Sequence, residues 1–374
     1  MKQKKGVIIM ILLDFIKEHE NWREILIEKP YCISIKEKDG YALFKYSQVD
    51  SDMSLPIVRE CRGVIIDLED MEVACRRFDK FFNASEPNVA KLSGSIRAEE
   101  KIDGSIIGVW RDRAGIWRVS TNGMIDASDA DLTLPLDNIR TYRDLFDEAW
   151  RNQVGNSFSI LNSYKDYTMI FELVSPSNRI VIPYKKTALY FLGIRNNRTG
   201  EEISPIDDRV SELKKYFPTP KIFDIHTIED AKEVAKTLGA DQEGFVLVDE
   251  HFNRVKVKGA EYLAKHLMRN NDLSLKNFLA TVLNDTQDDL LAYFPEYTKY
   301  IDDVKGRLDN YIAEVEADIE AAPFELDRKE FALAVKDKPN SAVLFKLYGN
   351  KDYDWKAVEI NIDNINKLAQ KLGL

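Results

Sequence analysis

The sequence feature that most constrains the fold is a change in hydrophobic pattern near Gly259. From about residue 33 to residue 259 the chain consists of short runs rich in β-branched and aromatic residues, separated by Gly, Asn, Asp or Pro, a pattern typical of strands joined by turns. Helical spacing interrupts these runs near residues 139–152 and 228–238. After Gly259 apolar residues recur every three to four positions, as in amphipathic helices.

This change predicts two domains. Residues 1–260 are expected to form an α+β domain of mostly antiparallel sheets with helices, and residues 261–374 an all-helical C-terminal domain. Within the second domain the predicted helical stripe is carried by a set of apolar residues: Val304, Leu308, Ile312, Val315 and Ile319.

Composition is that of a globular protein in a reducing compartment. The 374 residues are 44% apolar and 31% charged, which is ordinary for a folded chain. The three cysteines have no Cys-x-x-Cys spacing, which argues against a disulfide framework or a zinc site. The apolar run near the N-terminus is too short for a membrane span and merges into a helical pattern. No membrane association is therefore expected.

The formal net charge is −10, whereas phosphate-binding proteins usually carry a basic surplus. An acidic protein can still bind RNA through a local basic groove. The charge therefore weighs against a nucleic-acid partner without excluding one.

The stretch "EEKIDGSIIGVW", residues 99–110, places Lys101 two residues before an Asp-Gly pair that leads into an apolar run. Asp-Gly is a common hairpin turn, and a lysine beside it is ordinary. Taken alone, the stretch is compatible with a solvated charge or with an amine held at the end of a strand.

Other motifs before and after Lys101 supply charged groups that a phosphate-handling site needs. They are "ECRG" with Arg62, "DKFFN" with Lys80, "FELVSPSNRIV" with Glu172, "EGFVLV" with Glu243, and "KVKG" with Lys256 and Lys258. The last two lysines are two residues apart on a predicted strand, so they share a face and need either a common anion or solvent. Glu172 has apolar neighbours and needs a cation, a metal or a hydroxyl unless the strand turns it to solvent.

A lysine amine is a poor nucleophile while it is protonated. Lys256, Lys258 and a hydrated Mg²⁺ close to Lys101 would lower its pKa, and the same cations would offset the charge of a triphosphate. The motifs together are therefore chemically consistent with a lysine that attacks a nucleotide.

In this order the motifs resemble the covalent lysyl-nucleotidyltransferase superfamily and, within it, the bacteriophage ATP-dependent RNA ligase 1 family. The resemblance covers most of the first 260 residues. It implies that Lys101 attacks the ATP α-phosphate to form lysyl-AMP, that Asp103 and Gly104 complete the motif, and that Mg²⁺, replaceable by Mn²⁺, is required. The ATP-contacting residues that it implies are Tyr46, Arg62, Lys80, Glu172, Glu243, Lys256 and Lys258.

Two positions need separate statements. Asn122, in "VSTNGM", stands where the family often carries a lysine, which puts one phosphate contact in doubt. Asp288, in "QDDL", falls where the family has a metal-supporting aspartate in its helical domain. The alternative for Asp288 is an exposed helix carboxylate.

The resemblance implies ATP-dependent joining of RNA 5′-phosphate and 3′-hydroxyl ends through lysyl-AMP and an adenylylated RNA 5′ end, with tRNA repair as one role. The expected partners are ATP and single-stranded RNA or nicked tRNA, and the expected setting is a monomer in the cytoplasm of a phage-infected bacterium. A DNA ligase or mRNA-capping guanylyltransferase shares the nucleophile motif but usually continues into a β-barrel. A non-catalytic RNA-end-binding protein is the third alternative, suggested by Asn122 and the acidic charge.

Overall fold

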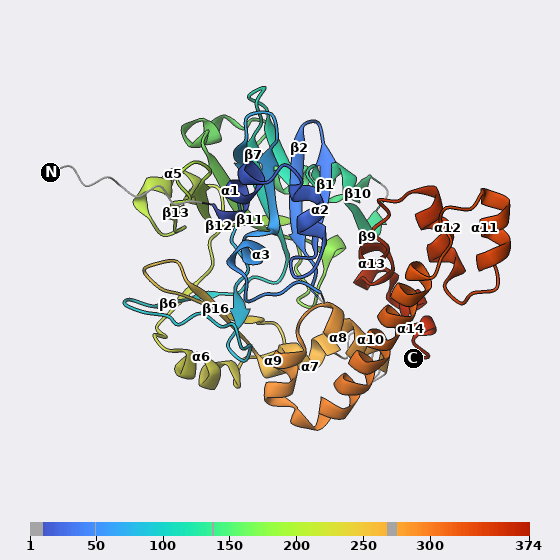
Figure 1. Ribbon diagram of the computed structural model, residues 1–374. Helices are drawn as coiled ribbons and strands as arrows, with labels where there is room; N and C mark the ends of the chain where they lie inside the picture. The colour runs from blue at the N-terminus through green and yellow to red at the C-terminus, as the bar shows by residue number, and fades with distance from the viewer. Residues whose placement is uncertain (1–9, 49, 137, 268–274) are drawn as a thin grey trace. The chain divides into compact units, whose positions relative to one another are not determined.

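The computed structural model describes residues 10–48, 50–136, 138–267 and 275–374. The chain divides into two compact units, Met1–His266 and Leu267–Leu374 (Figure 1). In the described residues no helix has the length and apolar character needed to cross a lipid bilayer.

The first sheet of the first unit is antiparallel, with the order β1-β2-β3-β4. Asp39 and Gly40 both have positive φ, 54° and 82°, so Asp-Gly forms the two-residue turn between β1 and β2. The elements are β1 (Ile33–Lys38), β2 (Tyr41–Tyr46), β3 (Arg62–Asp67) and β4 (Glu72–Cys75), with helices α1 (Ile11–Glu18), α2 (Trp22–Ile27) and α3 (Pro56–Glu60).

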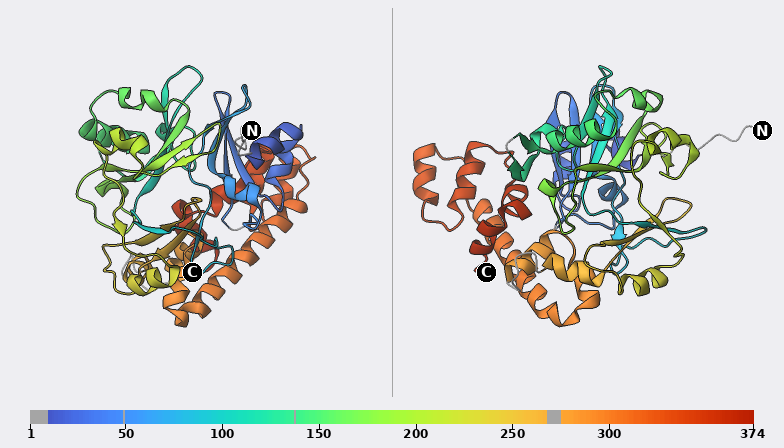
Figure 2. Two further views of the ribbon diagram at one scale, coloured as in Figure 1. Left: turned by 90° about the vertical axis from the view of Figure 1, so that its left-hand side faces the viewer. Right: turned by 180° about the vertical axis from the view of Figure 1, so that it is seen from behind.

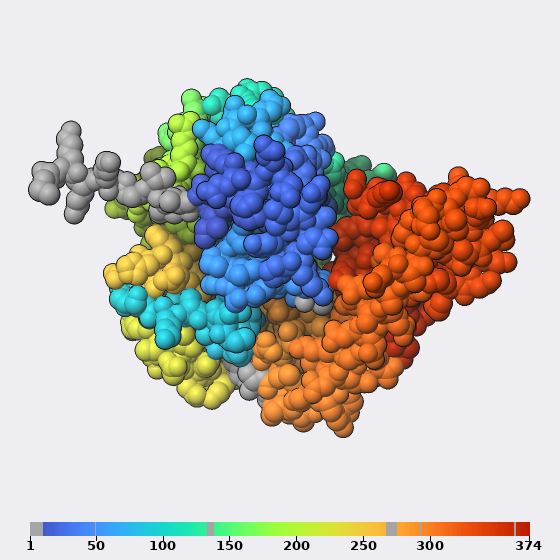
Figure 3. Space-filling model, viewed as in Figure 1, coloured from blue at the N-terminus to red at the C-terminus, as the bar shows by residue number. Residues whose placement is uncertain are grey.

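Strand β2 is buried on both faces. Ala42 and Phe44 pack with residues of α1, α2 and α3, whereas Tyr41 and Leu43 pack with Trp110 on the other side. This is the alternation that a strand imposes on successive side chains. The helices cover this face of the sheet, and α1 and α2 lie in the dark blue region of Figure 3.

The second sheet has the order β13-β12-β11-β7-β8 and carries the largest core. Strand β4 of the first sheet contacts β7 and β11, so the two sheets lie side by side (Figure 2, left). The elements are β7 (Ser105–Arg111), β8 (Trp117–Ser120), β9 (Asp131–Leu136), β10 (Ile139–Thr141), α4 (Tyr142–Gln153), β11 (Tyr167–Val174), β12 (Ala188–Asn196), β13 (Glu202–Ile203) and α5 (Ser211–Lys214).

The third sheet has the order β14-β6-β15-β16-β5, and its β16–β5 pair is parallel. Helix α6 packs against β15 and β16 through Ala231 and Ala235, and Leu238, just after the helix, joins the same core. The elements are β5 (Phe82–Asn83), β6 (Arg97–Glu100), β14 (Ile222–Phe223), α6 (Ile228–Ala235), β15 (Gly244–Val248), β16 (Arg254–Lys258) and α7 (Ala260–Leu267).

The described part of the second unit is helical. On its longest helix, Val304, Leu308, Ile312 and Val315 are buried, as their spacing predicts, and Ile319 packs against a smaller core around Phe331. The helices are α8 (Leu275–Leu283), α9 (Gln287–Tyr293), α10 (Thr298–Glu320), α11 (Arg328–Val335), α12 (Ser341–Gly349), α13 (Trp355–Glu359) and α14 (Ile365–Lys371).

The predicted α+β class with mostly antiparallel sheets and C-terminal helices is confirmed. The helix expected from residue 139 begins at Tyr142 instead, because residues 139–141 pair with β9 as β10. Thr141 then caps the helix by accepting a hydrogen bond from the Asp144 backbone, while the Asp144 carboxylate bonds back to the Thr141 backbone, an arrangement that stabilises a helix start. The compact units divide at 266/267, and the functional division at 260/261 stays a prediction.

Candidate active site

Strand register brings Lys101, Glu243 and Lys258 to one end of the third sheet. Strand β6 is antiparallel to β15, with Phe245 opposite Glu100, and β15 is antiparallel to β16, with Gly244 opposite Lys258. The end of β6, the beginning of β15 and the end of β16 therefore meet. The Lys101 backbone N–H donates to the Gly244 carbonyl at 2.9 Å, and the Gly259 N–H donates to the Glu243 carbonyl at 2.9 Å.

Lys101 is held by a buried carboxylate. Its Nζ lies 2.8 Å from Glu243 Oε1, and Lys258 Nζ lies 3.9 Å from the same oxygen. The side chains of Glu243 and Lys258 are 4% and 9% exposed. Lys101 and Lys258 therefore belong to one charged cluster at the strand ends of this sheet. They are not solvated charges on an exposed face.

The Asp103-Gly104 pair is not a hairpin turn, because it carries the chain from β6 in the third sheet to β7 in the second. The Asp103 carboxylate accepts hydrogen bonds from the backbone N–H groups of Val181 and Ile182 at 2.9 and 2.7 Å and from the Tyr262 hydroxyl at 2.8 Å. A Cβ on Gly104 would lie 2.5 Å from the Leu173 carbonyl oxygen. Glycine is required here because the two backbones approach so closely.

Glu172 faces Lys101 across this connection. It lies opposite Ile106 of β7, and a Cβ on Gly104 would be 3.0 Å from the Glu172 Cγ. Burial raises the pKa of Glu172 to about 8, although Lys101 opposes the shift. Burial also raises the pKa of Glu243, against the influence of Lys101 and Lys258.

The pKa of Lys101 differs from the expectation that neighbouring cations lower it. Burial lowers the pKa of the amine, but Glu243 and Glu172 outweigh burial, and the net shift is upward. The chain by itself therefore keeps Lys101 as an ammonium ion, because its close neighbours are carboxylates.

The other basic residues lie against aromatic rings of the "DKFFN" motif. The Arg62 guanidinium is 5.1 Å and Lys256 Nζ 5.7 Å from the centroid of the Phe81 ring. Lys80 Nζ is 5.5 Å from the Tyr46 ring and 5.3 Å from the Phe82 ring. These are cation–π distances, so the aromatic residues of the motif hold the cations that flank the Lys101 cluster.

Arg77, which the sequence motifs did not indicate, links the backbone next to Arg62 to the backbone next to Asn122. Its fully buried guanidinium donates to the carbonyl oxygens of Gly63 and Thr121 and to the Ser120 hydroxyl. Gly63 has φ +75°, and a Cβ there would lie 2.7 Å from the Asn122 carbonyl oxygen. Asn122 thus lies beside the strand that begins with Arg62, and its side-chain Oδ1 is buried without a hydrogen-bond partner.

Two tyrosines and two cavities were also not predicted. The Tyr262 hydroxyl donates a hydrogen bond to the Asp103 carboxylate, and the Tyr184 hydroxyl accepts one from the Asp103 backbone N–H. The sequence signal for Tyr262 was its position just after "KVKG". A cavity of about 80 Å³ beside Lys101 is lined by Glu100, Tyr184, Phe245 and neighbouring residues. A larger cavity of about 210 Å³ lies at the ends of β2, β3 and β7 that are away from Lys101. None of the expected site residues lines it.

A divalent cation fits the carboxylates of the cluster. Glu243 Oε2 is buried without a hydrogen-bond partner, and burial outweighs the neighbouring cations in raising the pKa of both Glu172 and Glu243. Mg²⁺ commonly binds through one or two carboxylates together with substrate phosphates and water. The described residues contain no group of three or more His, Cys, Asp or Glu side chains arranged for a metal, so the cation would need the phosphates of a substrate.

Asp288 belongs to α9 of the second unit. Burial raises the pKa of its carboxyl group, against the influence of Lys305. It is partly exposed, and among the described residues it belongs to no group of three or more His, Cys, Asp or Glu side chains that could hold a metal. Its role with a metal stays a prediction.

Comparison with known proteins places this geometry in a family. Residues 60–262, which contain the motifs from Arg62 to Lys258, match the family model described as RNA ligase. The chain belongs to the RNA ligase family. The match covers more than half of the chain and ends at Tyr262, the partner of Asp103.

Curated relatives carry ligase names. A protein of Autographa californica nuclear polyhedrosis virus, named as a bifunctional polynucleotide kinase/RNA ligase, is 28% identical over 81% of this chain. This chain spans only 44% of that protein's length. An RNA ligase of Rhodothermus phage RM378 is 25% identical over 78% of this chain and 82% of its own length, and RNA ligase 1 of bacteriophage TS2126 is 27% identical over 69% and 64%.

Solved structures agree on the fold. An archaeal ATP-dependent RNA ligase superposes with a TM-score of 0.51 and 14% identity, covering 96% of this chain and 81% of the other. A second form of an archaeal enzyme of the same description gives 0.50 and 16%, covering 78% of each chain. At these identities the likeness shows the shared fold alone.

The raised pKa of Glu172 predicts a pH-dependent gain in stability for Glu172→Gln. The folded-state pKa of about 8 exceeds the ordinary value of 4.5, so Glu172 stabilises the fold fully below pH 4.5, and this contribution is lost as pH rises through 8. Without nucleotide and with EDTA present, the glutamine variant should gain on the order of 1–3 kcal/mol relative to the unchanged protein between pH 5 and pH 9.

Urea unfolding at both pH values measures this difference. Glu72→Gln, at an exposed position of β4, is the matched control and should show no such trend. Parallel stability curves for Glu172→Gln and the unchanged protein would contradict the burial-driven shift.

Proposed function

We propose that this RNA ligase family member joins RNA ends using ATP, with Lys101 as the nucleophile. The observation that carries the proposal is the position of Lys101 Nζ, 2.8 Å from buried Glu243 at the junction of two sheets. Arg62, Lys80, Lys256 and Lys258 surround this junction with positive charge. An amine next to a base and within a cluster of cations suits attack on a triphosphate.

In the first step the Lys101 amine attacks the α-phosphorus of ATP. A P–N bond forms, the bond between the α-phosphorus and the bridging oxygen breaks, and pyrophosphate leaves. Because the free chain keeps Lys101 protonated, its proton must be transferred before attack, and Glu243 Oε1 is the nearest acceptor at 2.8 Å. Burial raises the pKa of Glu243 and so makes it a stronger base.

A divalent cation, Mg²⁺ or Mn²⁺ in its place, would be held by Glu172 and Glu243 and would offset the negative charge of the triphosphate. The basic side chains contribute to the same charge neutralisation from the chain itself. Lys256 and Lys258 share a face of β16, and Lys258 is close enough to Glu243 to influence which group holds the proton.

In the second step an oxygen of an RNA 5′-phosphate attacks the lysyl-AMP phosphorus, the P–N bond breaks, and AMP is transferred to the RNA. In the third step an RNA 3′-hydroxyl attacks the 5′-phosphate and AMP leaves.

Single-stranded RNA or nicked tRNA is the proposed substrate, as in tRNA repair during phage infection of a bacterial cytoplasm. The names of the phage relatives support this setting. Apart from Asp288, the proposed nucleotide contacts lie in one unit of one chain, so a monomer suffices.

A DNA ligase or capping guanylyltransferase is less compatible with the chain, because the described residues after α7 form helices rather than a β-barrel. A non-catalytic RNA-end-binding protein would have no use for a lysine amine paired with a buried carboxylate. Labelled nucleotides distinguish these classes: a capping enzyme takes label from GTP, and a binding protein takes none.

Replacing Lys101 tests the proposal directly. Lys101→Ala and Lys101→Arg should reduce labelling from α-³²P-ATP to background, because neither variant has an amine for the P–N bond. Circular dichroism should show an unchanged fold, since Lys101 lies at a strand end. Lys91→Ala, an exposed position, is the control and should label normally. Covalent label on either Lys101 variant would remove Lys101 as the nucleophile.

Lys256→Ala and Lys258→Ala should each slow lysyl-AMP formation by about 100-fold, because each removes one cation from a site that must stabilise a triphosphate. Lys236→Ala, at the exposed C-terminal cap of α6, which packs on the same sheet, should have no effect. If both single variants label at the normal rate, neither lysine contributes to stabilising the triphosphate.

We also propose that the helical unit selects the RNA. A chain that ends after residue 267 keeps α7 and the Tyr262–Asp103 hydrogen bond, so it should still form lysyl-AMP but lose discrimination among RNA substrates. Asp288→Ala in the full chain separates a metal role from an RNA role, because only a metal role slows labelling. Folded truncated protein that discriminates RNAs as the full chain does would overturn this division.

A further inference from the structure

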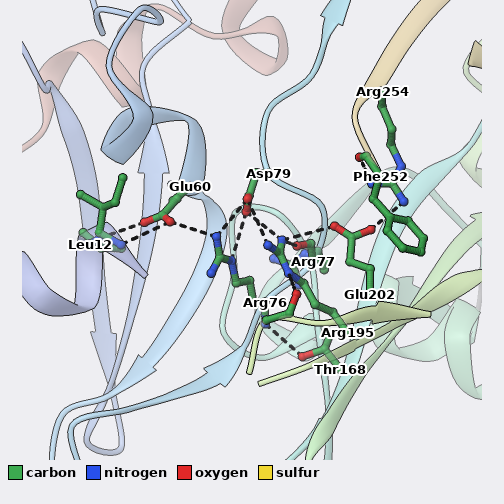
Figure 4. Close-up of polar contacts among 12 residues, drawn as sticks. Leu12, Glu60, Arg76, Arg77, Asp79, Thr168, Arg195, Glu202, Phe252 and Arg254 are labelled. Atoms are coloured by element: carbon green, nitrogen blue, oxygen red, sulfur yellow. Dashed lines mark hydrogen bonds and ion pairs between the residues drawn. The ribbon is translucent and has the colours of Figure 1, made fainter. Parts of the chain in front are cut away.

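A largely buried ion-pair chain runs through the first unit (Figure 4), with the Asp79 side chain at its centre 32% exposed. At its centre two guanidinium groups hold the Asp79 carboxylate. Arg76 donates from Nε and Nη2 at 3.2 and 2.9 Å, and Arg195 donates from Nη1 and Nη2 at 3.0 and 3.2 Å. Asp79 is thus fixed by four charge-assisted hydrogen bonds, the strongest class available to side chains.

The chain extends in both directions from Asp79. On one side Arg76 pairs with Glu60 at 3.0 Å, and Glu60 accepts from the Leu12 backbone N–H at the start of α1 at 2.8 Å. On the other side Arg195 Nη1 lies 3.7 Å from Glu202, its cross-strand neighbour. Glu202 in turn lies 2.7 Å from Arg254 Nη2.

The centre of the ion-pair chain and its Glu202 arm lead to proposed phosphate contacts. Asp79 immediately precedes Lys80 in residues 76–81, which have no regular secondary structure, so the Asp79 contacts add to the hydrogen bond from the Lys80 backbone N–H to the Arg59 carbonyl in fixing the path of this segment. Arg254 begins β16, two residues before Lys256, and its guanidinium lies 3.9 Å from the Phe78 ring. The ion-pair chain therefore spans from the Lys80 loop to the strand that carries Lys256 and Lys258.

Stability alone does not account for such a chain. Buried ion pairs pay a large desolvation cost and are often replaceable by apolar residues without loss. What they provide is a defined geometry, because a misaligned buried charge is costly.

We propose that Asp79 and Glu202 are positioning residues that fix Lys80 and β16 relative to each other and so set the affinity for the ATP triphosphate. Neither residue is proposed to touch the nucleotide. This inference rests on the proposed function, since it assumes that Lys80 and β16 contact ATP.

Glu202→Gln tests the inference, with Glu201→Gln as the matched control. Glu201 is the preceding residue and is about half exposed. It pairs with Arg209, which is not part of the ion-pair chain. Single-turnover labelling from ATP gives a half-saturating ATP concentration and a maximal rate for each protein. Both are measured at a temperature well below the midpoint of thermal unfolding of that protein. Glu202→Gln should raise the half-saturating concentration by about tenfold and keep the maximal rate within about twofold, while Glu201→Gln should match the unchanged protein.

A double-mutant cycle provides the readout that a general loss of structure would not give. If Asp79 and Glu202 act through one chain, the variant carrying Asp79→Asn and Glu202→Gln should bind ATP no more weakly than Asp79→Asn alone. Arg254→Met, which keeps the packing on Phe78, replaces Asp79→Asn in the cycle if the latter does not fold.

An unchanged half-saturating concentration in Glu202→Gln, or multiplicative effects in the double variant, would overturn the inference. A fall in maximal rate alone would overturn it too. Failure of the proposed function looks different, because the unchanged protein would then take no label from ATP at any concentration.

Discussion

The contact on which the site depends is the ion pair between Lys101 and Glu243. It forms because β6 ends where β15 begins, so the lysine at one strand end meets the glutamate before the next strand. The same register adds Lys258 from the end of β16. Glu172 joins from another sheet only because the Asp103-Gly104 connection crosses between the two sheets at a point where no Cβ fits.

Buried Glu243 and partly buried Glu172 share this small space with Lys101, and the electrostatic result is an excess demand for positive charge. The chain meets part of it with Lys258 and Arg62, and the pKa values of Glu172 and Glu243 stay raised. A substrate that brings cations with it therefore relieves an unfavourable arrangement. The acidic overall charge of −10 does not conflict with this, because the relevant cations gather around the Phe81 and Phe82 rings.

Much of the fold was predictable because its signals are local. The alternation in β2, the helical spacing after Gly259 and the strand runs around Glu172 and Glu243 each lie within a few residues. The network of Asp79, Arg195, Glu202 and Arg254 was not predictable, since Arg195 lies 116 residues from Asp79 in the sequence and an arginine on a strand reads as a surface charge. The upward pKa shift of Lys101 in the chain without a metal ion was not predictable for a related reason: the motifs list the cations and the acids, but only the register shows that the acids are nearer.

The Asp103 carboxylate has a structural role in addition to its place in the nucleotide-transfer motif. It accepts hydrogen bonds from the 181–182 segment and from Tyr262 of α7, so it joins three parts of the chain that are distant in sequence. A serine would be too short and a glutamate too long to reach both partners in the same place. The aspartate would therefore persist in a descendant whose lysine had been lost, because the packing of that loop and helix requires it. In a related chain that keeps the other motifs, an Asp-Gly at this position without the lysine two residues before it would mark inherited architecture rather than a working enzyme.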